Sequence, residues 1–470
     1  MRSLSQLVED IQLLTQEIQE LYRLGLPIIL GYSGGKDSSV VVQLFWNAIA
    51  LLPESERTRP IYVISTDTLV ENPMVAEWVK GSLTKMEQAA SQQKMPFHPH
   101  LLTPAIKDSF WVNLIGKGYP APRTHFRWCT DRLKIKPSNS FIRNTICEHG
   151  ETVLGLGIRK AESVARSAAM VKREQGRVRD RISPNASLPG SYIYSPVEDW
   201  RTDEIWIYLN QWTNPWGASN KELFALYRGA TADNECPLVV DTSTPSCGSS
   251  RFGCWVCTMV DKDKSMEAMI QNDEDKEWMQ PLLDRRNELD VVDDSDRREF
   301  RRLNGKVQFF EGKDGELQLI RGSYLREWRE TWLRKLLQAE VQTGIPLISI
   351  EELKEIRRIW LHEKHELDDS LPQIYQEVTG KIFPVNQLTA IQQLELEVLD
   401  EVSGGDEQFK SMMISLLSVE FQYGLKRNRK GVLGALNSVI EKQAFSEEEA
   451  VSNAKAHYQN KSDWGRFKFG

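Results

Sequence analysis

Two groups of residues in this chain of 470 residues have types and spacings that could do chemistry, and the first is a short polar loop after an apolar run. The loop reads Ser33-Gly34-Gly35-Lys36-Asp37-Ser38. Its glycines have no Cβ, so backbone N–H groups can approach an anion closely, and a helix starting there would favour negative charge. The serine hydroxyls and the Lys36 ammonium complete a cradle for a polyphosphate. The plain alternative is a glycine turn followed by a serine-capped helix.

The second group consists of four cysteines within 22 residues, Cys236, Cys247, Cys254 and Cys257. Thiolates this close in sequence suit an iron–sulfur cluster, for which we expect [4Fe-4S], or a structural zinc ion. Zinc sites more often contain two Cys-x-x-Cys pairs, and here only Cys254 and Cys257 form one. Free buried thiols are the remaining alternative.

Cys129 stands apart from these four, in a basic segment. We expect Arg127, Arg132 and Lys134 to lower its pKa and to favour the thiolate. Cys129 could then carry a persulfide, attack a substrate, or replace one of the four clustered cysteines as a ligand. Cys147 precedes a predicted strand and is expected to be a core thiol.

The elements that must position these groups alternate between strands and helices. Apolar strands are predicted at 27–31, 61–68, 97–102 and 153–157, and helices at 1–24, 36–46, 73–93 and 200–212. This order indicates an α/β fold with a doubly wound, mostly parallel sheet, whose ligand crevice lies beyond the carboxyl ends of the strands. Asp67 occupies such an end, where the sugar or base of a nucleotide would lie, although it could simply cap the turn.

Composition divides the chain into four parts: an N-terminal helix (1–26), the α/β domain (27–212), a cysteine-rich insertion (213–262) and a mainly helical C-terminal region (263–470). Residues 213–245 are rich in Asn, Pro, Gly, Ser and Thr and predict loops. The C-terminal region is highly charged, with a hairpin predicted near 306–320 and helices at 324–341, 350–366 and 387–402.

Charge is distributed unevenly along the chain. The net charge is −7, yet the stretch from Arg123 to Arg181 holds fourteen Lys/Arg against six Asp/Glu, a local charge of +8. We expect an anion-attracting patch there, although a solvated helical face or the arginines of the phosphate site would give the same count. No apolar run reaches eighteen residues and the N-terminus has no signal pattern, so we expect a cytoplasmic protein without a membrane partner.

The polar loop is not a Walker A loop, because that pattern has four residues between its glycines and Ser or Thr after the lysine. It resembles the PP-loop of the ATP pyrophosphatase superfamily, whose members usually cut ATP between the α and β phosphates. This resemblance implies ATP and Mg²⁺ as cofactors, with catalytic roles for Lys36 and Asp37. Asp37 would help to hold Mg²⁺, with helix capping as its alternative role.

Three further segments, at 127–137, 157–166 and 194–208, resemble the PAPS and APS reductases. The resemblance implies that the nucleotide is contacted by Arg159 and Arg166, and that an oxyanion substrate is bound by Arg127, Arg132, Lys134, Arg159 and Glu162. Arginine and lysine suit this role as bidentate or point-charge clamps for oxyanions. The last cysteine is Cys257, so the C-terminal catalytic cysteine usual in PAPS reductases is missing.

The loop, the basic segments, the four cysteines and the charged helical tail together resemble the DndC family of DNA phosphorothioation proteins, over about residues 20–340. The resemblance implies an adenine nucleotide α-hydrolase-like fold and an ATP-dependent sulfurtransferase. Such an enzyme would adenylate a DNA backbone phosphate and replace a non-bridging oxygen with sulfur from a cysteine desulfurase. Other Dnd-type subunits are then expected partners. A PAPS/APS-type sulfonucleotide reductase and a non-catalytic nucleotide-sensing subunit remain the alternatives.

Overall fold

The chain folds into two compact units in the computed structural model. The first comprises Met1–Phe110 and Pro122–Leu289, and the second comprises Trp111–Ala121 and Asp290–Gly470. This boundary after Leu289 differs from the one that composition suggested after residue 262. The structure describes residues 2–124, 126–231, 252–302, 305–312, 315–364, 366, 368–384, 398–424, 429–443 and 446–466.

A six-stranded sheet forms the centre of the first unit. Its strands are β1 (Ile28–Gly31), β2 (Ile61–Thr66), β3 (Phe97–Leu102), β4 (Thr152–Gly155), β5 (Ile182–Pro184) and β6 (Ser191–Tyr194). They lie in the order β3-β2-β1-β4-β6-β5, and every pair is parallel except β5 with β6. The predicted doubly wound, mostly parallel sheet is therefore confirmed.

Strand β1 is the point at which the strand order reverses. It pairs with β2 on one side and with β4 on the other, and Ile28 is in register with both Ile61 and Val153. In such sheets the crevice beyond the carboxyl ends of the strands at the reversal is the usual ligand site. The loops that follow β1, β2 and β4 must therefore meet at one edge of the sheet.

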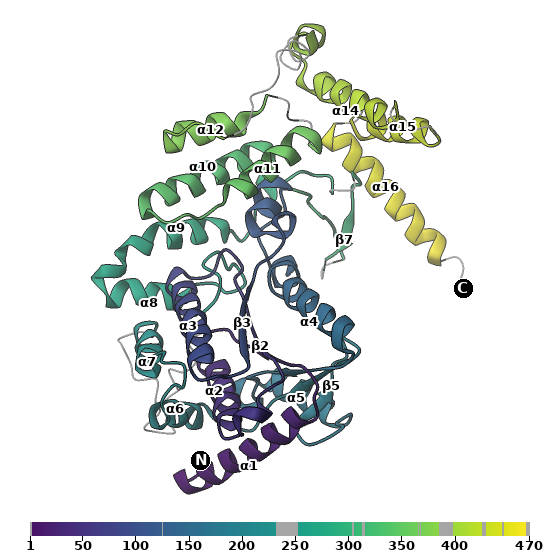
Figure 1. The fold of residues 1–470 in the computed structure, drawn as a ribbon. Helices are drawn as coiled ribbons and strands as arrows, with labels where there is room; N and C mark the ends of the chain where they lie inside the picture. Colours follow the sequence, from purple (N-terminus) through teal and green to yellow (C-terminus); the bar gives the residue numbers. More distant parts are fainter. Residues whose placement is uncertain are drawn as a thin grey trace. The chain divides into compact units, whose positions relative to one another are not determined.

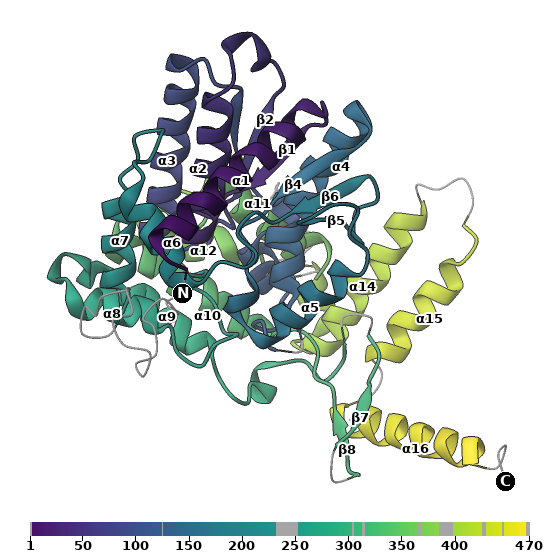
Figure 2. The same cartoon turned by 90° about the horizontal axis from the view of Figure 1, so that it is seen from below.

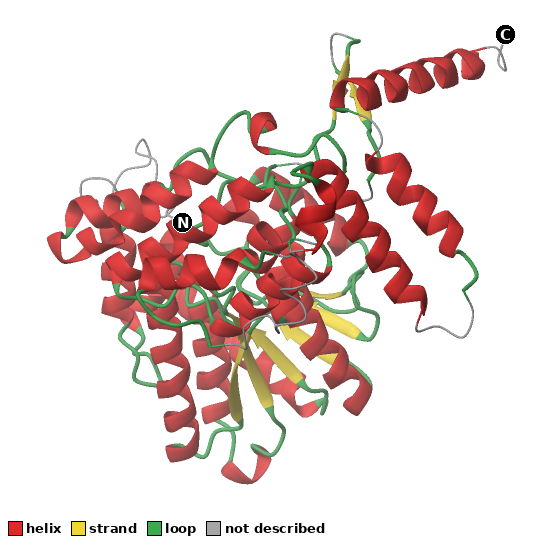
Figure 3. Cartoon of the chain, turned by 90° about the horizontal axis from the view of Figure 1, so that it is seen from above, coloured by secondary structure: helices red, strands yellow, loops and turns green. Residues whose placement is uncertain are grey.

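Helices cover both faces of this sheet (Figures 1 and 3). Ile28 and Leu30 of β1 belong to the larger core cluster, which includes residues of α1, α2, α3 and α6, whereas Ile29 belongs to a separate cluster with Ile142 of α4. This alternation follows from the two-residue period of a strand. The helices are α1 (Leu4–Arg23), α2 (Lys36–Ala50), α3 (Pro73–Gln92), α4 (Lys136–His149) and α6 (Thr202–Gln211).

The expectation that residues 213–245 form only loops is wrong for helix α7 (Asn220–Gly229). The Ser219 hydroxyl caps this helix by accepting a hydrogen bond from the Glu222 N–H, and Leu223 and Tyr227 are buried one turn apart. Residues 232–245 lie outside the described part of the chain. The other helices of the first unit are α5 (Val164–Glu174), α8 (Lys264–Asn272), α9 (Gln280–Leu289) and a π-helical turn at Thr130–Ile135.

The second unit is mainly helical, and its hairpin is confirmed: β7 (Phe309–Glu311) pairs antiparallel with β8 (Leu317–Leu319) (Figure 2). The helix predicted at 387–402 lies largely outside the described residues. No helix in the described part of either unit has the length and apolar character needed to span a membrane. In the described part of the second unit, the longer helices are α10 (Arg326–Thr343), α11 (Ile350–His362), α12 (Ser370–Thr379), α14 (Glu407–Gly424), α15 (Val432–Gln443) and α16 (Glu447–Arg466).

Candidate functional site

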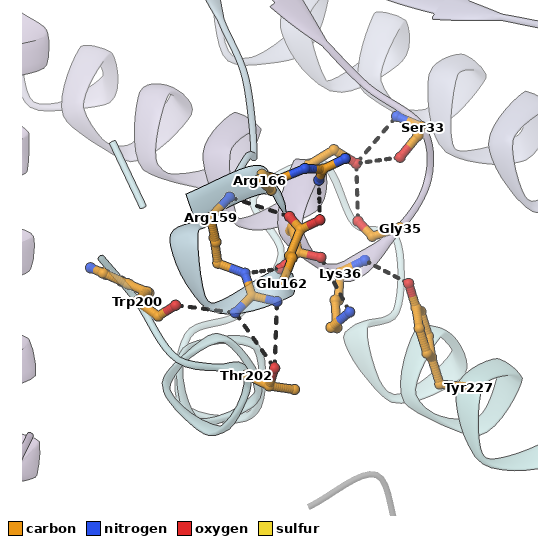
Figure 4. A network of polar contacts seen from close by, with 11 residues as sticks. Ser33, Gly35, Lys36, Arg159, Glu162, Arg166, Trp200, Thr202 and Tyr227 are labelled. Carbon is orange, nitrogen blue, oxygen red and sulfur yellow. Dashed lines mark hydrogen bonds and ion pairs between the residues drawn. The ribbon is translucent and has the colours of Figure 1, made fainter. Parts of the chain in front are cut away.

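The polar loop forms a tight turn between β1 and α2, as predicted. Gly34 has a φ of +72°, in the left-handed region, and a Cβ at this position would lie 2.4 Å from Cγ2 of Val79. The loop is braced by its own hydroxyls: Ser38 Oγ donates to the Gly35 carbonyl at 3.0 Å and accepts from the Ser33 N–H at 3.2 Å (Figure 4). The turn is therefore held in a defined shape before any ligand binds.

A cavity of about 820 Å³ opens beside this loop, at the carboxyl ends of β1, β2 and β4. Its volume is in the range of small-molecule and cofactor sites. The site residues predicted from the sequence that line it are Ser33, Gly34, Gly35, Lys36, Asp37, Ser38, Asp67, Lys134, Arg159, Glu162 and Arg166. Arg127, Arg132, Cys129, Cys254 and Cys257 are not among its lining residues, and Cys236 and Cys247 lie outside the described residues.

Arg159 is almost completely buried, and its guanidinium is directed at protein acceptors. Nε donates to Asp37 Oδ1 at 2.6 Å, and Nη1 donates to the Trp200 carbonyl at 3.1 Å (Figure 4). The other carboxylate oxygen of Asp37 lies 3.2 Å from Lys36 Nζ. Asp37 is thus held between two cations, so that Arg159 positions Asp37, and Asp37 positions the Lys36 ammonium.

The loop after β4 approaches the start of α2 closely because it contains Gly157. A Cβ on Gly157 would lie 2.7 Å from both the backbone carbon and the backbone oxygen of Asp37, and 2.9 Å from the Ser38 nitrogen. Real Cβ atoms do not approach backbone atoms so closely. Glycine at this position therefore allows Arg159, two residues later, to reach Asp37.

Glu162 links two predicted arginines. Its Oε1 accepts a hydrogen bond from the Arg159 backbone N–H at 3.2 Å, and its Oε2 forms an ion pair with the Arg166 guanidinium. The Arg166 side chain is 43% exposed, so it remains accessible at the edge of the cavity. Of the two arginines, Arg166 is the one available to a ligand.

Asp67 lies in the wall of the cavity and also caps a turn, whereas its contact with a nucleotide stays a prediction. Its Oδ1 accepts from the Leu69 N–H at 2.8 Å, which caps the turn after β2. Its Oδ2 lies 4.0 Å from Lys80 Nζ, and both Asp67 and Lys80 line the cavity.

Tyr227 of α7 is a cavity residue that sequence reasoning missed. Its hydroxyl accepts a hydrogen bond from the Lys36 backbone N–H at 3.3 Å, and Lys36 Nζ lies 5.2 Å from the centre of its ring. Burial, with a further contribution from Asp37, raises the pKa of Tyr227. Because almost 200 residues separate Tyr227 from the loop, no local pattern could have identified it.

The segment that carries Cys254 is paired with the loop that follows β2. Trp255 N donates to the Val70 carbonyl at 2.9 Å, and Asn72 N donates to the Gly253 carbonyl at 3.3 Å. These backbone hydrogen bonds attach the thiol segment to a loop that also contributes Glu71 to the wall of the cavity.

The Cys254 thiol lies one side chain away from the cavity. Its Sγ is 3.3 Å from Thr68 Oγ1 and 3.8 Å from Glu71 Oε1, and the Glu71 carboxylate forms an ion pair with Lys134 Nζ at 3.1 Å. Burial raises the pKa of Cys254 to about 12, with Glu71 adding to the increase and Lys134 opposing it. Without a metal ion the thiol is therefore protonated at neutral pH.

The expectation that basic neighbours lower the pKa of Cys129 is wrong. Burial raises this pKa, Cys257 adds to the increase, and a hydrogen bond with Thr130 only partly opposes it. The physical reason is that the neighbouring basic side chains bind other groups. Arg132 lies 3.8 Å from Asp108, Arg127 donates a hydrogen bond to the Thr124 carbonyl, and Lys134 forms an ion pair with Glu71.

The cysteines in the described part of the chain do not by themselves make a metal site. No group of three or more His, Cys, Asp or Glu among the described residues is arranged to hold a metal ion. The Cys257 N–H donates to the Cys254 carbonyl at 3.0 Å, a tight turn that suits two ligands of a tetrathiolate site. The four-cysteine cluster therefore stays a prediction. Cys147 is exposed on α4, which corrects its expected place in the core.

The basic stretch from Arg123 to Arg181 presents less positive charge than its composition suggests. Arg143, Lys172 and Arg173 are exposed and form no ion pair with any described residue. Most of the others are paired with carboxylates, namely Arg132, Lys134, Lys136, Arg159, Lys160, Arg166, Arg177, Arg179 and Arg181.

This chain is similar to several known proteins over part of its length. An uncharacterised protein of Methanocaldococcus jannaschii, MJ0066, is 26% identical over 184 residues, which are 39% of this chain and 31% of that protein. Two solved structures match at 15% identity and a TM-score of 0.28. The first is a Candida auris PAPS reductase in a phosphate complex, and the match covers 45% of this chain and 87% of that one. The second is a Candida glabrata FMN adenylyltransferase with FAD and inorganic pyrophosphate, and the match covers 48% of this chain and 61% of that one.

The family model described as the phosphoadenosine phosphosulfate reductase domain matches residues 27–259. This range contains the polar loop, the basic segments and all four clustered cysteines. Residues 27–259 of this chain therefore form a region similar to the phosphoadenosine phosphosulfate reductase domain.

Proposed function

We propose that this protein is an ATP-dependent sulfurtransferase that adenylates a backbone phosphate of DNA and replaces a non-bridging oxygen with sulfur. The observation that carries the proposal is that one side chain of the cavity wall also contacts the segment that holds Cys254. Glu71 lines the cavity beside the loop and is also in contact with Cys254. An activated phosphate and a sulfur atom could thus meet without a large movement of the chain.

The first step is the activation of a poor leaving group. A non-bridging phosphate oxygen attacks the α-phosphorus of ATP, the bond between the α and β phosphates breaks, and pyrophosphate leaves with the electron pair. Lys36 and the backbone N–H groups at the start of α2 would stabilise the charge that develops on the pyrophosphate. Asp37 and Arg159 would act indirectly, because Arg159 holds Asp37 and Asp37 holds the Lys36 ammonium in place.

The second step transfers sulfur. A persulfide, loaded on a cysteine by a desulfurase, attacks the activated phosphorus through its terminal sulfur, and AMP leaves with the oxygen. A second thiol then attacks the remaining S–S bond, which leaves a protein disulfide and a phosphorothioate diester. An external thiol must reduce the disulfide before the next turnover. Cys129, which is not one of the four clustered cysteines, would be one of the two thiols in this step.

Two cofactors belong to the proposal. Cys236, Cys247, Cys254 and Cys257 would hold a [4Fe-4S] cluster, which when bound would supply electron transfer or carry sulfide; zinc is the alternative metal. Mg²⁺ would arrive on the phosphates of ATP. Because both carboxylate oxygens of Asp37 already face cations, Mg²⁺ would reach Asp37 only if Lys36 moved away.

Support for DNA as the acceptor comes from the resemblance to the DndC family and from three exposed cations. Arg143, Lys172 and Arg173 form no ion pair among the described residues, and α5, which carries the last two, also contributes Arg166 to the cavity. Cations of this kind would contact phosphates and make binding weaken with salt. A cysteine desulfurase and other Dnd-type subunits are the proposed partners.

The test is pyrophosphate release and sulfur incorporation by the full chain. Anaerobically purified protein is incubated with ATP, duplex DNA, cysteine, a cysteine desulfurase and a thiol reductant, and the digested DNA is examined for phosphorothioate by mass spectrometry. We expect Lys36→Ala to lower the rate of pyrophosphate release by about 10²–10³-fold. Lys94→Ala, which removes a surface lysine paired with Glu54, is the matched control. Equal rates in the wild type and Lys36→Ala would refute the proposal and favour a non-catalytic subunit.

A sulfonucleotide reductase is the second candidate, favoured by the family match over residues 27–259. It predicts sulfite formation from PAPS or APS with a thiol reductant and without ATP. Sulfite formation together with the absence of pyrophosphate release would replace the first proposal with this one.

A further inference from the structure

The hydroxyl of Tyr227 has an unused hydrogen-bond donor inside the cavity. A tyrosine hydroxyl carries one donor and two acceptor positions. Its oxygen accepts from the Lys36 N–H, and this is its only hydrogen bond among the described residues. Tyr227 lines the cavity and is only 5% exposed. A buried donor without a partner is costly, so a ligand oxygen there would satisfy it.

The surroundings of Tyr227 hold its ring in place. The rings of Trp206 and Phe252 meet it edge-on, with centroids at 5.2 and 4.8 Å. A Cβ at Gly35 would lie 3.1 Å from the hydroxyl oxygen, so the loop backbone packs directly against it. Tyr227 is therefore a fixed part of the cradle and does not have to leave when an anion enters.

We propose that the Tyr227 hydroxyl donates a hydrogen bond to an oxygen of the polyphosphate bound at the loop, so that α7 supplies one ligand of the anion cradle. This inference rests on the proposed function for the presence of the polyphosphate. The oxygen of the same hydroxyl keeps its hydrogen bond from the Lys36 N–H, while the Lys36 ammonium lies over the ring. One side chain thus contacts the ligand and orders the first residue of α2.

The protonation state of Tyr227 agrees with a donor. Burial raises the pKa of the phenol, and Asp37 raises it further, so the hydroxyl keeps its proton at neutral pH. The start of α2, whose dipole favours negative charge, lines the same cavity.

The experiment measures the binding of two probes, inorganic pyrophosphate and adenosine, to the full chain by calorimetry. Tyr227→Phe keeps the ring and removes only the hydroxyl. We expect it to weaken pyrophosphate binding by about tenfold or more, the usual loss for a hydrogen bond to a charged group, and to leave adenosine binding unchanged. The matched control is Tyr208→Phe. Tyr208 is equally buried, but its hydroxyl accepts from Asn47 away from the cavity.

The outcomes separate this inference from the proposed function. If the wild type binds neither probe, the proposed function fails. If the wild type and Tyr227→Phe bind pyrophosphate equally while Lys36→Ala does not bind it, only the role of Tyr227 is refuted. Tighter binding by Tyr227→Phe would also refute it, because the hydroxyl would then be competing with the phosphate for the Lys36 N–H. An equal loss for both probes would point to a structural role and overturn the inference.

Discussion

Replacement of Gly157 by alanine is the sharpest test of how the phosphate loop is positioned. The φ of Gly157 is not positive, so alanine meets no backbone penalty there, and any loss of stability must come from the contacts of its methyl group. That methyl would lie 2.7 Å from two backbone atoms of Asp37 and 2.9 Å from the Ser38 nitrogen. Backbone atoms cannot rotate aside, so either the β4 loop or the start of α2 must move.

The magnitude follows from this contact. Overpacking typically costs about 1–3 kcal/mol, and contact with backbone on two residues puts Gly157→Ala at about 2–3 kcal/mol. At about 2–4 °C per kcal/mol for a domain of this size, the Tm is expected to fall by about 4–12 °C. A shift of the helix start also misplaces the anion cradle, so pyrophosphate affinity is expected to fall by about tenfold or more.

The assay combines thermal unfolding with pyrophosphate calorimetry on the full chain. Gly81→Ala is the matched control, since Gly81 lies inside α3 and a Cβ there meets no atom within 4 Å. Helix propensity then predicts a gain of about 0.5–1 kcal/mol and no change in affinity. If Gly157→Ala matched the wild type in both Tm and affinity, the close contact between the β4 loop and α2 would not exist in solution.

Three further predictions concern other positions. Gly34→Ala should destabilise the protein by about 1–3 kcal/mol, because Gly34 has a positive φ and the new Cβ would lie 2.4 Å from Cγ2 of Val79. An unchanged Tm would contradict this prediction. Arg159→Lys should lower the free energy of unfolding, measured in urea, by about 1–3 kcal/mol, because a lysine ammonium cannot make the two hydrogen bonds of the planar guanidinium. The exposed control Arg173→Lys should leave this free energy almost unchanged. Equal losses in the two variants would refute the structural role of the Arg159 guanidinium. Burial, with a contribution from Arg329, lowers the pKa of Lys364 to about 8. Its protonation therefore opposes folding below about pH 8, and this penalty disappears as the pH rises towards the ordinary lysine pKa of about 10.4. Lys364→Met should accordingly raise the Tm at pH 7 and lose most of this advantage by pH 10. If the difference in Tm between Lys364→Met and the wild type did not change with pH, the charge of Lys364 would not be its cause.

The central strands and the phosphate loop could be predicted because their signals are local. An apolar run followed by two glycines, a lysine and serines specifies a strand, a turn and a helix start within a dozen residues. The helix predicted at 73–93 is α3, which Asn72 caps and which has proline in its first turn. The rule that ligands bind beyond the carboxyl ends of parallel strands also placed Asp67 at the crevice without any knowledge of side-chain packing.

The parts of the site that could not be predicted depend on contacts between distant segments. Cys129 has basic neighbours in sequence, yet their side chains face Asp108 and Glu71, so a count of local charge gave the wrong direction for its pKa. Tyr227 reaches the loop from a helix that was itself missed, because the loop-forming residues around Ser219 obscured two buried positions at helical spacing. Charge counting likewise could not reveal which arginines are already paired.

The strip Trp111–Ala121 is part of the second unit, although the chain on both sides of it belongs to the first. Trp111 Nε1 donates to the Leu347 carbonyl, and Trp360 Nε1 donates to the Ile115 carbonyl, both at 3.0 Å. A truncation after residue 289 would therefore keep the strip and discard the helices α10 and α11 that cover its apolar side chains. Anyone dividing this protein for separate expression would have to replace the strip with a polar linker in one fragment and graft it onto the other.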